Sequence, residues 1–236
     1  MMSAPQTANP PLRPAREIEP PLGLLGFVTA GLFIAGLLVS TFRAAGTPFP
    51  SPFSSPDDAL TYFRTYPDAV RTGAVLQFAC TIPLTIYVAT ATARLRALGR
   101  QAPGITIALA GGVLAAAFLA SSSLVTWVLT VRGVTAEPAL VRALHNLAFL
   151  VGGPGTVVST GLLIAGIAIT ALPAKLFASW VIRIGLAIAV ASLLSTLVLT
   201  VPVAAFLLPI SRFTGLAWLI AVGFLIDRRP NPLSSN

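Results

Sequence analysis

Long runs of apolar residues, separated by short polar segments, dominate the chain. The first run, residues 22–42, contains 21 residues and no charge. As a helix it would be about 31 Å long, which matches the roughly 30 Å hydrocarbon core of a bilayer. The pattern predicts an all-α integral membrane protein, with six spanning helices in one domain over residues 22–228. The other five runs cover residues 72–93, 105–131, 139–172, 177–200 and a last stretch that ends at Ile226.

The fourth apolar run is too long for one straight crossing. Its 34 residues, 139–172, would extend for about 51 Å as a continuous helix. The segment Gly152-Gly153-Pro154-Gly155 lies near the middle of the run. Because proline removes a backbone donor and glycine weakens a helix, we expect a kinked or broken fourth helix at this point. The preceding segment, residues 132–138, is expected to be a loop.

Proline also affects the second and sixth runs. Pro83 lies near the middle of the second run and predicts a kink there. At the start of the sixth run, Pro202 and Pro209 leave two arrangements open. Either a kinked helix begins at about Val203, or a loop leads to a short helix that begins at Arg212.

The segment between the first two runs, residues 44–69, is too polar and too rich in proline to lie in lipid. Within it, Ser55-Pro56-Asp57-Asp58 combines a capping side chain, a proline at the first helical position and an acid three residues after the cap. We therefore expect a short helix at residues 56–66 on the extracytoplasmic membrane surface. Its apolar face would carry Leu60, Phe63 and Tyr66.

Composition narrows the class of protein. Hydrophobic residues make up 56% of the chain and charged residues 9%, against about 25% charged in an ordinary soluble domain. These values exclude a cytosolic enzyme, a disordered regulator and a secreted disulfide scaffold. Since Cys80 is the only cysteine and His145 the only histidine, neither an internal disulfide nor a Cys/His metal site is expected. No nucleotide-binding loop is recognisable, so we predict no cofactor and no metal.

The positive charge predicts topology. The formal net charge is +8, but the basic residues stand singly at the ends of apolar runs, so nucleic acid is not an expected partner. An even number of spans puts both tails, residues 1–21 and 229–236, on one side. Nine of the fifteen basic residues then lie on that side and six on the other, which predicts cytoplasmic termini. The use of arginine in place of lysine is typical of a GC-rich genome and favours a bacterial inner membrane. The proline-rich first tail is expected to be disordered.

Candidate chemistry is concentrated in the fourth run. Arg142, His145 and Asn146 are spaced to lie on one side of a helix. Ionisable groups at membrane depth usually face a bundle interior or an aqueous cavity. One hypothesis is an outward-opening pocket in which Arg142 anchors an anion or head group, His145 accepts a proton, and Gln77 and Ser122 add polar lining. The other is that Arg142 reaches the interface and His145 bonds a hydroxyl of the third span.

Two segments of the chain match each other without a gap. Residues 28–40 and 158–170 share valine, glycine, leucine, isoleucine and alanine at corresponding positions. Since the first and fourth spans cross in opposite directions, the match fits an inverted repeat. Apolar helices draw on few residue types, and the second and third spans show no comparable match at the same offset, so chance similarity is the favoured interpretation and duplication the alternative.

Three features together carry a resemblance to a known family. They are the capped segment 55–66, the Gly152–Gly155 segment and the stretch Phe206-Leu-Leu-Pro-Ile-Ser-Arg-Phe-Thr-Gly-Leu-Ala-Trp-Leu-Ile220. Over residues 22–228 the chain resembles an uncharacterised bacterial family of six-helix multi-pass membrane proteins, known as a domain of unknown function. The resemblance implies neither an activity nor functional residues.

Two functions remain open from the residues. The favoured hypothesis is a non-enzymatic membrane module that binds a membrane lipid, another membrane protein or a second copy of itself. The alternative is a small-molecule carrier, or an enzyme acting on a lipid-soluble substrate, with a polar pocket around Arg142 and His145. All seven acids fall in tails and loops, which argues against ion-coupled transport.

Overall fold

A computed structural model describes residues 20–53, 55–97 and 102–228; the predicted tails at 1–21 and 229–236 lie outside these residues except for Pro20 and Pro21. The described part is helical, and no strand occurs in it. Its elements are α1 (Leu22–Arg43), α2 (Pro56–Thr65), α3 (Pro67–Ala97), α4 (Pro103–Val128), α5 (Arg132–Thr135), α6 (Pro138–Leu150), the π-helical turn η1 (Val151–Gly155), α7 (Thr156–Ala174), α8 (Ser179–Leu194), the 3₁₀ segments η2 (Ser195–Leu199) and η3 (Pro202–Phe206), and α9 (Leu207–Asp227).

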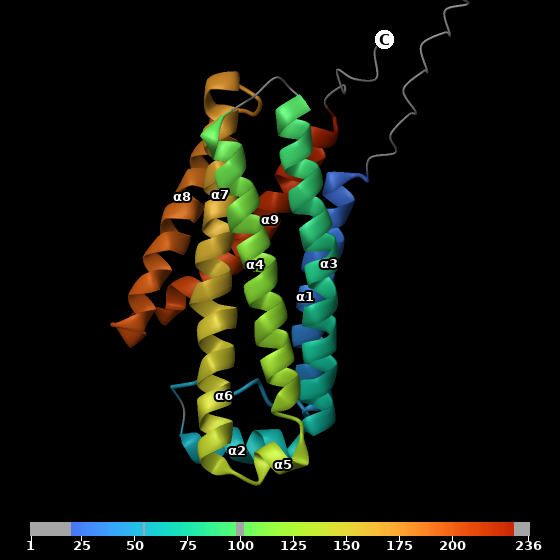
Figure 1. Cartoon of the computed structure of the whole chain (residues 1–236), viewed down its shortest axis with the longest axis vertical. Helices are drawn as coiled ribbons and strands as arrows, with labels where there is room; N and C mark the ends of the chain where they lie inside the picture. Colours follow the sequence, from blue (N-terminus) through green and yellow to red (C-terminus); the bar gives the residue numbers. More distant parts are fainter. Residues whose placement is uncertain (1–19, 54, 98–101, 229–236) are drawn as a thin grey trace, which may run out of the picture.

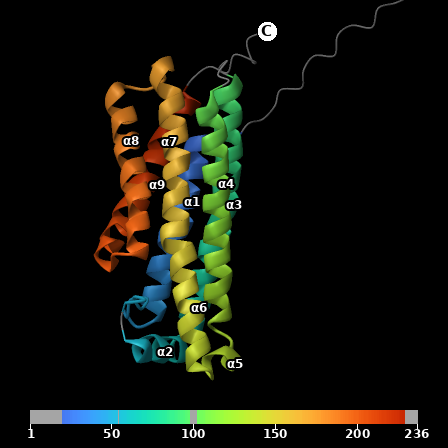
Figure 2. The same ribbon diagram turned by 60° about the vertical axis from the view of Figure 1, so that its left-hand side comes forward.

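Among the described residues, six helical segments are long and apolar enough to cross a membrane, which confirms the predicted six-helix bundle. Three of them are the single helices α1, α3 and α4. The other three are composite, because α6, η1 and α7 form one rod, η2 extends α8, and η3 precedes α9. Neighbours in this order contact each other, and α9 returns to α1, so the spans form a closed ring (Figures 1 and 2).

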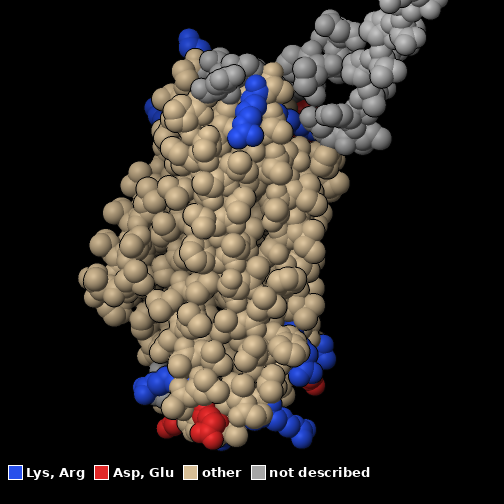
Figure 3. Space-filling model, in the orientation of Figure 1, with Lys and Arg blue, Asp and Glu red and all other residues tan. Residues whose placement is uncertain are grey.

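The outer surface of the ring is apolar. Phe27, Phe42 and Val203 are more than half exposed, at 62%, 84% and 77%. Figure 3 shows lysine, arginine and acidic residues at the two ends of the molecule, with a broad uncharged band between them. A soluble protein rarely exposes an apolar surface of this extent. The band therefore fits a hydrocarbon environment.

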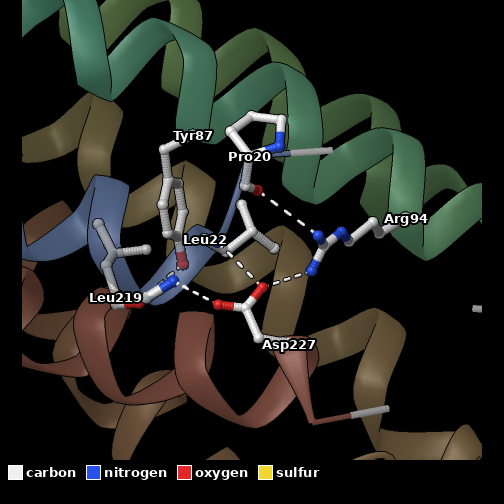
Figure 4. Close-up of polar contacts among 7 residues, drawn as sticks. Pro20, Leu22, Tyr87, Arg94, Leu219 and Asp227 are labelled. Carbon is white, nitrogen blue, oxygen red and sulfur yellow. Dashed lines mark hydrogen bonds and ion pairs between the residues drawn. The ribbon is translucent and has the colours of Figure 1, made fainter. Parts of the chain in front are cut away.

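The two ends of the bundle domain meet at one carboxylate (Figure 4). The first N–H groups of a helix lack partners within the helix. In α1, the N–H groups of Leu22 and Gly23 donate to the carboxylate of Asp227, at 3.0 and 2.8 Å. Asp227 also forms an ion pair with Arg94 of α3, and both side chains are about one-fifth exposed. The last residue of α9 thus caps the first span and places both ends of the bundle domain on one side of the ring.

Backbones touch where α4 crosses α7. A Cβ atom added to Gly166 would lie 2.5 Å from the amide nitrogen of Ala108 and 2.8 Å from its Cα. Real side chains do not pack this closely, so glycine at this position sets the distance between the two helices. Leu163 and Ile167 of α7 are fully buried on either side of the contact.

The fourth span is interrupted where expected, but the chain stays helical throughout. The N–H of Thr156 donates to the carbonyls of Val151 and Gly153, and an i to i+5 bond of this kind defines a π-helical turn. Such a turn accommodates Pro154, which has no N–H to donate. The predicted interruption is therefore a local π-helical turn and not a loop.

The end of the bundle away from the termini is closed by α2 and α5 (Figure 2). The predicted cap is confirmed, since the Ser55 hydroxyl accepts a hydrogen bond from the N–H of Asp57 at 3.3 Å. The apolar face of α2, which carries Ala59, Tyr62 and Phe63, is buried against α3, α5 and α6. Tyr62 lies in this buried face, in addition to the predicted Phe63.

One loop prediction was wrong, and one open alternative is decided. Residues 132–138 contain the helical turn α5, whose last carbonyl, on Thr135, accepts two hydrogen bonds from Arg64 at 2.9 and 2.7 Å. The sixth span begins with η3 and continues into α9, so the first of its two predicted arrangements holds. Pro209 lies in the first turn of α9, where a missing N–H costs little. As a result Arg212 lies inside the span.

Candidate functional site

A cavity of about 440 Å³ lies inside the ring. Its walls come from α1, α3, α4, the α6–η1 rod, η3 and α9, and its volume is in the range of small-molecule binding sites. Most of the lining is apolar, including Phe33, Leu37, Leu119, Phe149 and Phe213. The polar side chains of the lining include Gln77, His145 and Arg212, which come from three different helices.

A non-helical segment, residues 47–53, covers one side of the cavity; we call it the strap. Phe49, Pro50 and Phe53 of the strap line the cavity. The ring of Phe53 packs edge to face on Phe149, with 5.5 Å between centroids. Phe49 packs in the same way on Phe63 of α2, at 5.6 Å. Aromatic contacts therefore hold the strap to both α2 and the fourth span.

His145 is the polar link between the fourth span and the strap. It is 4% exposed, and its Nε2 lies 3.2 Å from the carbonyl oxygen of Pro50. Because a carbonyl can only accept, this bond requires the proton to be on Nε2, which leaves Nδ1 as an acceptor in the neutral ring. Phe49 and Phe63 flank the imidazole, at 5.7 and 5.4 Å between ring centroids.

Arg212 supplies the positive charge of the cavity. Its guanidinium donates a hydrogen bond to the carbonyl of Gly152 in the π-helical turn and lies over the ring of Phe33, 5.3 Å from the centroid. The Nε atom of Arg212 is buried and has no hydrogen-bond partner. Within the described ranges, no carboxylate forms an ion pair with this arginine. A cation therefore lies inside a membrane span without an opposite charge from the described residues.

The π-helical turn brings its backbone close to α4. A Cβ atom on Gly152 would lie 2.9 Å from the Cβ of Ser122, so glycine is required for this approach. Ser122 in turn donates to the carbonyl of Ala148, at 2.8 Å. Polar groups therefore occur along one wall of the cavity: the Ser122 hydroxyl, and the Gly152 carbonyl that accepts the hydrogen bond from Arg212.

The predicted site residues separate into two groups. Gln77, Ser122 and His145 line the cavity. Arg142 and Asn146 do not, because they lie on the exposed side of α6. Residues spaced by three and four share only part of a helix face, and the inward face of this rod is defined by Val141, His145, Ala148 and Gly152. The polar pocket is therefore centred on His145 and Arg212, without Arg142, and His145 bonds a backbone carbonyl of the strap instead of a hydroxyl of α4.

Arg212 was not among the site residues predicted from the sequence. A signal was present, since Arg212 is the only charged residue between positions 184 and 226. A lone cation within an apolar run usually faces a bundle interior. The uncertain start of the sixth span concealed this signal, because a helix that began at Arg212 would have put the charge at the interface.

The site holds no recognisable metal centre. Among the residues that the structure describes, no group of three or more His, Cys, Asp or Glu side chains could hold a metal ion. Cys80 is buried, with its thiol 3.0 Å from the carbonyl of Gln77. Comparisons of the chain with models of protein families, with curated proteins and with solved structures found no match, so the resemblance to an uncharacterised family stays a prediction.

Proposed function

We propose that the protein is a non-enzymatic membrane module that binds one lipid-soluble small molecule in the cavity beneath the strap. The supporting observation is an apolar cavity of about 440 Å³ to which Gln77, His145 and Arg212 contribute polar groups. An apolar wall with a few converging polar groups is the usual composition of a small-molecule site. A lipid-soluble ligand would reach such a site from the bilayer that surrounds the ring.

The polar contacts favour binding over catalysis. A nucleophile of the serine type needs a base within hydrogen-bond reach. The Ser122 hydroxyl instead donates to Ala148, and the Nε2 of His145 bonds the strap. Both groups therefore stabilise the cavity wall and the strap, which is the role expected of a preformed binding site.

Part of the proposal concerns location. We place the protein in a bacterial inner membrane, because its basic residues are almost all arginine, as is typical of a GC-rich genome. Both ends would lie in the cytoplasm, because nine of the fifteen basic residues lie on the side of the two tails. The strap and α2 would then lie on the extracytoplasmic side, and membrane lipids would be the first partners. Reporter fusions at residues 1 and 236 test this topology: cytoplasmic signals at both ends support it, and opposite or external signals contradict it.

The binding proposal is tested by blocking the cavity. Ala148 lines the cavity and is 5% exposed, whereas Ala143 is exposed on the other side of the same helix. Purified protein with Ala148→Phe should lose the small molecule that native mass spectrometry detects on the wild type, and Ala143→Phe should keep it. The proposal is contradicted if both variants retain the bound molecule. It is also contradicted if the wild type carries no bound small molecule.

Transport of the same ligand is the second candidate function. It is favoured by the strap, since Phe49 and Phe53 are 39% and 53% exposed while they also line the cavity. These residues therefore separate the cavity from the outside by a single layer. The release of loaded ligand from proteoliposomes distinguishes the two functions. Release that is faster with the wild type than with Ala148→Phe would favour a carrier, whereas binding without release would favour the module.

A further inference from the structure

We propose that the ligand is a single-chain amphiphile with an oxyanion head, a carboxylate or a phosphate, that pairs with Arg212. This inference rests on the proposed function, because it names the class of molecule that the cavity binds. The cavity combines one permanent cation with walls that are mostly aromatic or aliphatic. A ligand complementary to this surface has one negative end and one apolar body.

The guanidinium of Arg212 has hydrogen-bond donors that the described residues leave unused. A guanidinium carries five N–H groups in a planar fork. In the structure one terminal nitrogen donates to the Gly152 carbonyl, and the buried Nε has no partner. Carboxylates and phosphates present two oxygens that accept two parallel hydrogen bonds from such a fork, one at each oxygen, whereas a hydroxyl or a carbonyl has a single oxygen. The two terminal nitrogens carry four N–H groups, of which one is used by Gly152, so these nitrogens have donors left for a bidentate acceptor.

The positive charge of Arg212 also favours an anionic ligand. A cation inside a membrane span is costly unless it is paired or solvated. The contacts of Arg212 are a carbonyl dipole and the face of Phe33, and neither cancels a full charge. No carboxylate of the described chain lines the cavity. An anionic ligand would supply the missing charge, whereas a cationic ligand would be repelled.

The size and shape of the cavity favour a ligand with a single chain. About 440 Å³ is suited to a small molecule or one chain, and is too small for a whole two-chain phospholipid. Phe33 and Phe213 of the lining pack edge to face beside Arg212, at 6.4 Å between centroids. Phe49 and Phe149 line the strap side of the same space. The apolar body of the ligand would extend from the guanidinium along these rings.

The test compares probes that differ only in the head group. Wild-type protein in nanodiscs of phosphatidylcholine is titrated with dodecanoate, dodecyl phosphate, dodecanol and inorganic phosphate, and the dissociation constants are measured. We expect at least one anionic amphiphile to bind about tenfold or more tightly than dodecanol, as one charge-assisted hydrogen-bonded pair implies. Inorganic phosphate should bind more weakly than either anionic amphiphile, because it lacks the chain.

Variants assign the preference to one side chain. Arg212→Gln should remove the difference between the anionic probes and dodecanol, and Arg212→Lys should retain part of it. Arg142→Gln, which neutralises an exposed arginine of α6, should leave it unchanged. The comparison within the wild type does not depend on whether a variant folds.

The outcomes separate the two proposals. Equal affinity for dodecanol and the anionic probes would overturn the oxyanion inference while the binding function stands. A preference that survives in Arg212→Gln, or tight binding of inorganic phosphate alone, would overturn it as well. If no amphiphile binds the wild type, the proposed function fails together with the inference.

Discussion

The carboxylate that joins the two ends of the bundle domain offers a sharp test of the fold, because the chain carries its own control. Asp227 accepts hydrogen bonds from Leu22 and Gly23 and pairs with Arg94, at one-fifth exposure. Asp68 instead forms an exposed pair with Arg71 at 3.7 Å, where its side chain is 77% exposed. The same substitution, aspartate to asparagine, thus removes one charge in two different surroundings.

The expected loss follows from the bonds that asparagine cannot make. The three donors to Asp227 are the N–H groups of Leu22 and Gly23 and the guanidinium of Arg94. An asparagine side chain has only one acceptor oxygen for them, and its NH₂ group would face at least one of these donors. Loss of a helix cap costs about 1 kcal/mol, and loss of a buried charge partner costs about 3–5 kcal/mol before discount for partial exposure. We therefore expect Asp227→Asn to lower the free energy of unfolding by about 2–3 kcal/mol, or the melting temperature by about 5–10 °C. Asp68→Asn should change the free energy by less than about 0.5 kcal/mol.

Thermal unfolding in a mild detergent, followed by tryptophan fluorescence, measures both variants under the same conditions. The double substitution Asp227→Asn with Arg94→Gln should cost less than the sum of the single ones, because the two side chains share one interaction. Equal shifts for Asp227→Asn and Asp68→Asn would refute the reasoning. Such a result would mean that the network in Figure 4 does not hold the first and last spans together.

Three further predictions concern packing and the strap. Gly166→Ala should lower the free energy of unfolding by about 1–3 kcal/mol through overlap with α4, whereas Gly31→Ala, where a Cβ meets nothing within 4 Å, should be neutral or stabilising; equal effects in thermal unfolding would contradict the close contact. Burial raises the pKa of Tyr62 above its ordinary value of 10.0, so the folded state holds the phenolic proton more tightly and stability should fall as the pH rises above about 10. Tyr62→Phe should flatten that part of the stability profile and cost nothing below it, since the Tyr62 hydroxyl is buried without a partner; an unchanged profile would exclude this role. His145→Phe keeps a ring between its aromatic neighbours but loses the bond to Pro50, so about 1 kcal/mol should be lost in thermal unfolding, and a loss near zero would show that this bond does not secure the strap.

The six spans and the capped helix α2 were predictable because each depends on local sequence. An uncharged run such as residues 22–42 has one stable form in lipid, and Ser55 followed by Pro56 defines a helix start. The form of the Gly152–Gly155 interruption was not predictable, since a π-helical turn and a break have the same composition. The resolution of the sixth span likewise depended on tertiary packing of η3 against η2 and α9.

The site was predictable only in part. His145, Gln77 and Ser122 were selected because they are polar groups in apolar runs, and all three line the cavity. Arg142 was selected for its spacing from His145, but a small rotation about the helix axis decides which residue faces inward. Arg212 comes from a helix distant in sequence, and its position beside Gly152 results from the order of the spans in the ring, which one sequence does not reveal.

Photo-crosslinking tests most directly the proposal that an anionic amphiphile lies inside the ring beside Arg212. Dodecanoate with a diazirine on its chain would be irradiated with the protein in nanodiscs, and the labelled residues would be identified by mass spectrometry. We expect labels on cavity residues such as Leu119, Ala148 and Phe149, reduced by Arg212→Gln and by excess unlabelled dodecanoate. Labels confined to outward-facing residues such as Phe42 and Val190, and insensitive to Arg212, would contradict the claim.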